Sequence, residues 1–310
     1  MNRHSTSLVA LMTFALWTGI ALDARAQSMC TSASQQNCYR FLCNGMDANG
    51  NIENVCSNGC TAQNAPRWAS PTIPVRVDRT IVPSSLGTAA WNNVVDGTLD
   101  AWEAVSSSNM VLQDIGNADY RRTNDPQSEI FWITSTSEWQ QKIGSGVYGA
   151  LGVTIPLYYC GNPGEITTAD LIMNGAGFTN WKATQSQCTG SGCTSARATL
   201  LHELGHWVGL DHPCQACAWS AMSASAYTEP DYPLAVDAAA VSALYPGSPG
   251  GIGYGCSTNA QCNSPYSCTL VDEVRYCTQT CNGTCPEGFI CDDVGGTDYC
   301  IYDAGPLARP

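Results

Sequence analysis

The sequence predicts an α+β fold followed by small disulfide-rich modules, and three observations support this fold class. Between residues 67 and 246, segments with the apolar pattern of strands alternate with segments that have the apolar spacing of helices. A stretch rich in Gly, Pro and Ser follows at residues 247–253, which we interpret as a flexible linker. Beyond it, eight of the eighteen cysteines lie within residues 254–302, and residues 303–310 form a short tail.

The first 26 residues are typical of a signal peptide. Arg3 precedes an apolar run from Leu8 to Leu22, and Ala24-Arg25-Ala26 provides small residues for cleavage. The run is interrupted by Thr13 and Thr18, whereas a membrane-spanning helix needs about 20 apolar residues. All eighteen cysteines lie after this segment. We therefore expect a secreted, extracellular protein without membrane insertion, in a compartment where disulfides form.

Residues 27–66 form a cysteine-rich N-terminal segment, which we interpret as a pro-segment or a cap. It holds five cysteines, and a second group of five lies between Cys160 and Cys217. If every cysteine pairs and the last eight pair among themselves, at least one bridge joins this segment to the central domain. Cys214 and Cys217 could form a redox pair, but structural disulfides are more typical of a secreted chain.

The central domain, residues 67–246, is expected to contain strands and helices in a definite order. The apolar patterns predict strands at 73–78, 129–133, 149–155 and 166–173. They predict a long amphipathic helix over 89–105, a second helix that begins at Thr194 or Ser195, and an alanine-rich helix over 234–245 that ends at Pro246. The first helix carries its core residues at helical spacing: Trp91, Val94, Val95, Leu99, Trp102 and Val105.

The chemistry is concentrated in residues 202–212, HELGHWVGLDH, which contain every histidine of the chain except His4. Positions four apart share one face of a helix, so His202 and His206 can bind one metal ion. Gly209 can end the helix in a left-handed conformation and bring His212 back as a third ligand. Three imidazoles with an open position for water form a catalytic zinc site.

Glu203 lies beside this ligand set without belonging to it. Zinc lowers the pKa of a bound water to about 7, and a carboxylate in this place can take the proton as the water attacks a carbonyl. The pattern therefore indicates hydrolysis of peptide bonds with Glu203 as general base. Two surface histidines on a helix would explain the short H-E-x-x-H pattern, but not the longer one with Gly209, His212 and a later Met222.

Residues 67–246 resemble the catalytic domain of the metzincin zinc endopeptidases, most closely the bacterial matrixin-like (matrix-metalloprotease-like) group. The resemblance rests on the zinc motif and on residues 73–77, 150–154 and 234–245. It implies a twisted mixed sheet with a long packing helix, a zinc-site helix, a Met-turn and a closing C-terminal helix. It also implies one catalytic zinc ion on His202, His206 and His212, with Met222 beneath the metal.

The resemblance further implies how a peptide substrate is bound. An extended peptide would pair with the edge strand near Leu151, Gly152 and Val153. Tyr227 and Tyr232 would line the pocket for the side chain after the cleaved bond. Cys43, in Cys-Asn-Gly-Met-Asp, faintly matches the thiol that blocks zinc in latent matrixins, although a disulfide is the compositional default.

The sequence departs from the matrixin pattern in two places. Pro213 follows the third histidine, where matrixins commonly carry Ser or Thr, and this is closer to the serralysin group. The histidines that hold a second, structural zinc in animal matrixins are missing, so a single zinc is expected. Secreted metalloproteases also use carboxylates for Ca²⁺, which the acidic surplus of this chain would allow.

The C-terminal module contains two repeats. The spacing of Cys262, Cys268 and Cys277 recurs in a second set of three cysteines, and Cys256 and Cys281 complete four per repeat. The second set consists of Cys285, Cys291 and Cys300. The spacing does not fit a zinc ribbon and favours two disulfide-linked units that bind substrate, matrix or a cell surface.

The net charge of the chain narrows the classes of molecule that it can bind. Thirteen Lys and Arg residues stand against 26 Asp and Glu, giving a net charge of −13, which argues against nucleic acid and anionic membranes. Protein or peptide substrates are expected instead. The alternative is a secreted adhesion or binding protein whose metal domain is vestigial, and the intact Glu203 argues against it.

Overall fold

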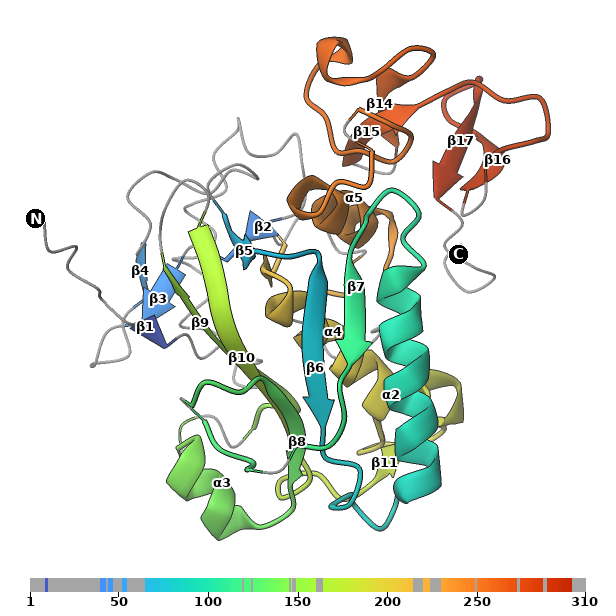
Figure 1. Cartoon of the computed structure of the whole chain (residues 1–310). Coiled ribbons are helices and arrows are strands. Elements are labelled where there is room, and N and C mark those ends of the chain that lie inside the picture. The colour runs from blue at the N-terminus through green and yellow to red at the C-terminus, as the bar shows by residue number, and fades with distance from the viewer. Residues whose placement is uncertain are drawn as a thin grey trace, which may run out of the picture.

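The computed structural model (Figure 1) shows an α+β domain with four α-helices and a mostly parallel sheet among the residues that it describes. These residues are 9–10, 40–42, 44–46, 52–54, 65–118, 120–123, 125–144, 146, 149–159, 164–213, 220–223, 230–248, 250–271, 274–286 and 289–302. The predicted signal peptide apart from Val9–Ala10, most of residues 27–66 and the tail at 303–310 lie outside this description.

The main sheet has the strand order β1-β9-β10-β8-β6-β7, and β5 also pairs with β10. The pairs between β10, β8, β6 and β7 are parallel, as is the pair of β10 with β5. The strand β9 runs antiparallel to β10. The bounds are β1 Val9–Ala10, β5 Pro66–Trp68, β6 Thr72–Val77, β7 Val111–Asp114, β8 Glu129–Ile133, β9 Gly152–Tyr159 and β10 Gly164–Asn174.

The helices are α2 Thr88–Glu103, α3 Thr136–Lys142, α4 Ala196–Trp207 and α5 Ala235–Leu244. The three that the sequence predicts are α2, α4 and α5. All six residues assigned to the core of the first helix region are buried. Ser195, one of the two proposed caps, accepts a hydrogen bond from the Ala198 backbone N–H and begins α4.

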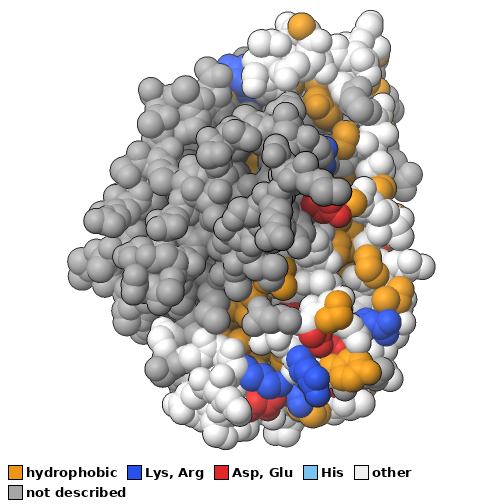
Figure 2. Space-filling view, turned by 60° about the vertical axis from the view of Figure 1, so that its left-hand side comes forward, with side chains coloured by type: hydrophobic (Ala, Val, Ile, Leu, Met, Phe, Trp, Pro, Cys, Tyr) orange, Lys and Arg blue, Asp and Glu red, His pale blue; other side chains and the backbone are white. Residues whose placement is uncertain are grey.

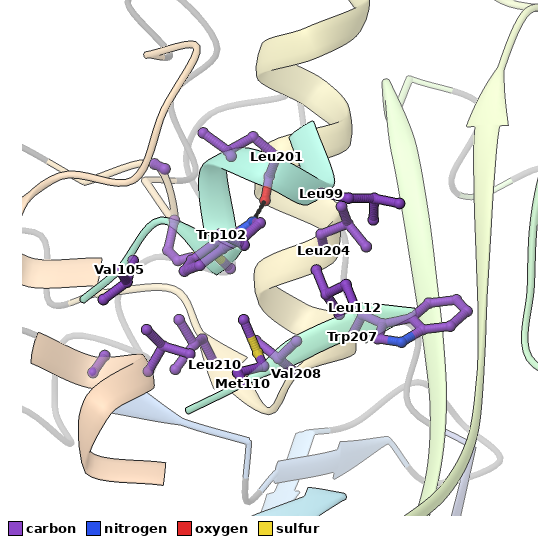
Figure 3. Packing of buried hydrophobic residues seen from close by; sticks show 14 of the residues in the cluster. Leu99, Trp102, Val105, Met110, Leu112, Leu201, Leu204, Trp207, Val208 and Leu210 are labelled. Atoms are coloured by element: carbon purple, nitrogen blue, oxygen red, sulfur yellow. Dashed lines mark hydrogen bonds between the residues drawn. The ribbon is translucent and has the colours of Figure 1, made fainter. Parts of the chain in front are cut away.

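The sheet separates two hydrophobic cores, because successive side chains of a strand point to opposite faces. In β8, Ile130 and Trp132 belong to the larger core, which also contains the buried residues of α2, α4 and α5. Phe131 and Ile133 belong to the smaller one, together with Trp139 of α3. Figure 3 shows the larger core where α2 meets α4, with the Trp102 indole N–H donating to the Leu201 carbonyl at 3.1 Å.

Some elements differ from the sequence prediction. The predicted strand at 149–155 begins later, at Gly152, where its pairing with Met173 starts, and it continues to Tyr159. The short strands β5 and β7 and the helix α3 were not predicted. α3 has only seven residues, most of them polar, so its apolar pattern is weak. The sequence feature that marks its start is the N-cap, Ser135, whose side chain accepts a hydrogen bond from the Glu138 backbone N–H at 3.2 Å.

The surface near α3 carries charges of both signs. The Lys142 ammonium lies 3.1 Å from Glu138, and Arg121 pairs with Asp78 at 3.2 Å. Figure 2 likewise shows basic and acidic side chains next to one another on the described part of that face. The pair of Lys142 with Glu138 is partly exposed, and pairs of this kind contribute little to stability, about 0–1 kcal/mol.

Further small strands lie outside the main sheet. Near the N-terminus, β2 Arg40–Phe41 pairs with β13 Leu210–Asp211, and β3 Asn44–Met46 pairs with β4 Ile52–Asn54. The parallel pair of β11 Trp181–Lys182 with β12 Thr194–Ser195 precedes α4. Among the described residues, none of the helices combines the length and the apolar character needed to cross a membrane.

The C-terminal module consists of two disulfide-linked hairpins, as the repeat predicts. The first is formed by β14 Ser267–Val271 and β15 Val274–Thr278, and the second by β16 Phe289–Asp293 and β17 Asp298–Tyr302. In each repeat the first cysteine pairs with the third and the second with the fourth. The bridges are Cys256–Cys268, Cys262–Cys277, Cys281–Cys291 and Cys285–Cys300.

The stretch interpreted as a linker is hydrogen-bonded at both ends. The Gly247 N–H donates to the Ser107 carbonyl at 3.0 Å, and the Gly253 N–H donates to the Cys277 carbonyl at 2.7 Å. Backbone hydrogen bonds therefore connect this stretch to the central domain at one end and to the first hairpin at the other.

Candidate metal and catalytic site

The site is built on α4, which packs against β9, β10 and α2 and has almost every residue buried. The helix fills this central place because its sequence is apolar on several sides and short side chains occur where neighbours approach. The polar residues on α4 that are buried are Thr199, His202, Glu203 and His206. Buried polar groups need partners, and the contacts of these side chains define the site.

The three predicted histidines come together. The Nε2 atom of His202 lies 3.1 Å from Nε2 of His212, and Nε2 of His206 lies 3.3 Å from the same atom. His202 and His206 are buried, and His212 is partly exposed. The three side chains could hold a metal ion. The cysteine groups with comparable spacing in the C-terminal module are disulfide-bonded and therefore have no thiolates to offer.

Backbone carbonyls set the tautomers of two of the rings. The Nδ1 atom of His202 lies 2.8 Å from the Ala221 carbonyl oxygen, and Nδ1 of His206 lies 2.8 Å from that of Leu210. A carbonyl only accepts, so each Nδ1 carries the hydrogen and each Nε2 presents a lone pair. Both lone pairs point at His212, whose Nε2 can donate at most one proton. This convergence of acceptors suits a cation.

Burial keeps these two rings neutral. Burial, then the charge of His206, lowers the pKa of His202 to about 3. Burial, then the charge of His212, lowers the pKa of His206 to about 3. Neutral imidazole is the form that binds metals, so both rings are ready for metal at neutral pH.

The turn at Gly209 brings the third histidine back, as the sequence predicts. α4 ends at Trp207, and Gly209 has a φ of 107°, in the region that favours glycine. A Cβ at Gly209 would also lie 2.5 Å from the Pro66 carbonyl oxygen. The two residues of β13 follow, and His212 comes directly after them.

Met222, predicted to form the Met-turn, packs against α4 at Gly205. Its side chain is 2% exposed, and a Cβ placed on Gly205 would be 2.0 Å from the Met222 sulfur. Gly205 lies within the motif between the first two histidines. A glycine at this position therefore allows the methionine to pack directly against the helix backbone.

A buried carboxylate that the sequence analysis did not identify holds the turn containing Met222. Asp237 of α5 accepts from the Ser220 hydroxyl at 2.5 Å and from the Ala221 N–H at 2.7 Å. The same carboxylate accepts from Leu234 N at 2.9 Å. Because Ala221 in turn accepts from His202, Asp237 is connected to the site through one residue. Asp237 lies three residues after Leu234, where the predicted helix begins, and this place, typical of a capping acid, was an available signal.

Glu203 is buried against the first part of β9. The Thr154 hydroxyl lies 2.8 Å from Glu203 Oε2 and 2.9 Å from the Glu203 carbonyl, so its single proton can serve one of them at a time. A Cβ on Gly152 would lie 2.8 Å from Cγ of Glu203. Gly152, predicted as substrate-binding, thus leaves space for the carboxylate side chain. Thr154 was missed, because no local pattern links it to Glu203.

The residues predicted to bind the substrate lie at the start of β9. Gly152 and Val153 begin β9, and Leu151 lies just before it. The Val153 side chain is buried in the smaller core, and Val153 pairs with Ile172 of β10. On the outer edge of β9, the described strand β1 pairs only with Leu157 and Tyr158.

Tyr232 lies in a segment that is tied to the start of α4. Asp231, the residue before it, accepts from the Gln185 N–H at 3.0 Å and from the Ser195 hydroxyl at 3.1 Å. The loop between Gln185 and Ser195 is closed by the disulfide Cys188–Cys193. Tyr232 itself is partly exposed. Tyr227, Cys43, Cys214 and Cys217 lie outside the described residues.

Compared with models of known protein families and with curated protein sequences, the chain gives no match. The assignment of a function therefore depends on the residues of the site.

Proposed function

We propose that the protein is a secreted zinc-dependent endopeptidase of the metzincin type, similar to the matrixins. One observation carries the proposal: the Nε2 atoms of His202 and His206 lie within 3.3 Å of His212 Nε2, and the first two histidines are on the helix that also bears Glu203. A vestigial metal domain would have no need to keep the glutamate, its hydroxyl partner and the carbonyls that orient the histidines.

The donor set fits zinc. Zinc binds imidazole nitrogen at 2.0–2.1 Å in tetrahedral geometry, which places neighbouring ligand atoms roughly 3.3 Å apart. The two measured separations are 3.1 and 3.3 Å. Three histidines leave one tetrahedral position open, the arrangement of catalytic rather than structural zinc sites. A bound zinc ion would polarise the scissile carbonyl and make water acidic enough to be deprotonated near neutral pH.

The protein groups supply the remaining chemistry. The Glu203 carboxylate accepts a proton from the attacking water and later passes it to the leaving amine. The hydroxyl of Thr154 fixes the position of this carboxylate. The neutral state of His202 and His206 ensures that protons do not compete for the ligand atoms. The role of Met222 is to form the floor of the site beneath the three histidines.

The substrate in this proposal is an extended peptide that pairs with β9. The peptide would add to the sheet beside Leu151, Gly152 and Val153, and strand addition uses backbone hydrogen bonds that do not depend on the side chains of the substrate. Tyr227 and Tyr232 would line the pocket beyond the cleaved bond. The C-terminal hairpins would bind substrate, matrix or a cell surface, and Ca²⁺ would bind acidic groups elsewhere.

Secretion fits the disulfides of the described residues. Five bridges are present, and disulfides persist mainly in oxidising compartments outside the cytosol.

A peptide library tests the proposal. The full-length protein and its proteolytically trimmed forms are loaded with zinc and incubated with mixed peptides, and cleavage is read by mass spectrometry. We expect cuts within peptides, their loss after chelation, and their return when zinc is added back. Zinc binding without any cleavage by any form would contradict the proposal and favour a binding protein.

A further inference from the structure

The segment at residues 40–42 pairs with the strand that carries the chain to the third histidine. β2 is antiparallel to β13, with Phe41 opposite Leu210 and Arg40 opposite Asp211. The Leu42 N–H donates to the Gly209 carbonyl at 2.9 Å. His212 follows Asp211 directly, so this pairing fixes the backbone between the helix end and the ligand.

The same pairing also bears on the second histidine. The carbonyl of Leu210 lies 2.8 Å from Nδ1 of His206. In an antiparallel ladder, pairs that exchange backbone hydrogen bonds alternate with pairs that do not. Leu42 and Gly209 are a hydrogen-bonded pair, so the next pair, Phe41 and Leu210, is not. The backbone N–H and carbonyl of Leu210 therefore face away from β2. β13 therefore has β2 along one edge and the ring of His206 along the other.

The side chains of this segment are part of the core. Phe41 is 6% exposed and Leu42 is fully buried, and both belong to the same hydrophobic cluster as Trp207, Leu210 and Leu244. Burying side chains of this size contributes about 1.5–3 kcal/mol each. A segment designed for release would have to uncover both of these side chains, together with the apolar surface beneath them.

We propose that residues 40–42 are a permanent positioning strand that holds His206 and His212 in place, and that maturation of the protein retains them. This inference rests on the proposed metal site and goes beyond it. Any removable portion of residues 27–66 must then lie outside the strand, and its loss must leave β2 attached.

The first test compares zinc retention in full-length variants. Leu42→Ala removes a fully buried side chain next to β13, and Ile133→Ala removes one from the smaller core on the other face of the sheet. Partners that orient metal ligands typically change metal affinity 10- to 100-fold when lost. We expect the zinc dissociation constant, measured by chelator competition, to rise by that factor in Leu42→Ala and by less than about twofold in Ile133→Ala. Equal affinities in the two variants would overturn the proposal.

A second measurement does not depend on whether the Leu42 variant folds. The zinc-containing form left after limited proteolysis of the parent is identified by its intact mass without reduction. We expect this form to retain residues 40–42. A form that lacks them and binds zinc as tightly as the full chain would overturn the proposal. If the uncut parent binds no zinc at all, the proposed function fails instead, and the two failures are thus distinguishable.

Discussion

Gly205 and Met222 are in contact, and there is no space for a side chain between them: a Cβ on Gly205 would lie 2.0 Å from the methionine sulfur. In an ordinary helix, replacing glycine by alanine stabilises a protein by about 0.5–1 kcal/mol. At this position the sign should reverse, because either the helix or the Met-turn must move. Both of these elements hold His202.

Gly205→Ala should therefore lower the thermal stability and weaken zinc binding at least tenfold. Gly97→Ala is the matched control, because Gly97 is also helical and the nearest atom to its added Cβ would be in the Arg197 side chain, at an ordinary 3.5 Å. We expect that control to be neutral or to stabilise the protein by up to about 1 kcal/mol. Calorimetry and chelator competition measure the two effects. If both variants gain stability, Met222 does not pack as described.

Thr154→Val should lower kcat about tenfold or more with little change in KM. The variant keeps the shape of the side chain but removes the hydroxyl that lies 2.8 Å from Glu203 Oε2. A tenfold change corresponds to about 1.4 kcal/mol, close to the lower limit of about 1.5–3 kcal/mol for a hydrogen bond to a charged group. Thr98→Val is the control, since Thr98 is equally buried and bonds only the Val94 carbonyl within α2. Steady-state kinetics of both variants would show whether the effect is local.

Asp237→Asn should destabilise the protein and weaken zinc binding. The carboxylate accepts from Ser220, Ala221 and Leu234, and an amide can accept on only one of its two atoms. A hydrogen bond to a buried charge contributes about 1.5–3 kcal/mol, so we expect a loss of this size. Burial raises the pKa of Asp237, and its hydrogen bonds oppose that change. Asp100→Asn, on the exposed face of α2, should change neither the stability nor the zinc affinity. Unchanged metal affinity in the Asp237 variant would mean that the Met-turn does not help to position the metal ligands.

The metal-free protein should lose stability as the pH falls from about 6.5 towards 3. Burial lowers the pKa of both His202 and His206 to about 3 in the folded state, whereas an exposed histidine titrates near 6.5. In this window the unfolded chain binds more protons than the folded one, so stability rises with pH and is fully present above 6.5.

Chemical unfolding between pH 4.5 and 6.5 measures this slope, because most carboxylates stay ionised in that range. The double variant His202→Gln and His206→Gln should show a distinctly smaller slope. An identical slope in the parent and the variant would mean that the two rings are protonated as easily in the fold as in the unfolded chain.

The elements recognised from the sequence are those with local signals. The helix α4, its cap Ser195, the turn at Gly209 and the ligand histidines all lie within eighteen residues of chain, 195–212. The disulfide hairpins were recognisable because their spacing repeats. Such patterns arise from periodicity and turn chemistry, which a single sequence displays directly.

The contacts that the sequence could not display join distant segments. Thr154 and Glu203 are 49 residues apart, and no periodicity relates them. Phe41 and Leu210 pair across the whole central domain. The position of β9 differed from the prediction because its start is set by its pairing with Met173 rather than by its own apolar pattern. Contacts of this kind depend on the topology of the sheet.

The most direct test of the account is the comparison of the parent with Glu203→Gln at equal zinc occupancy. Glutamine retains the size of the side chain and can still contact Thr154, but it cannot accept the proton. Metal content is measured first, and peptide cleavage is then followed by mass spectrometry. We predict one zinc ion per chain in both proteins and a loss of cleavage of 10²-fold or more in the variant. Equal cleavage by both proteins at full zinc occupancy would contradict the assignment of Glu203 as general base and the proposed mechanism that depends on it.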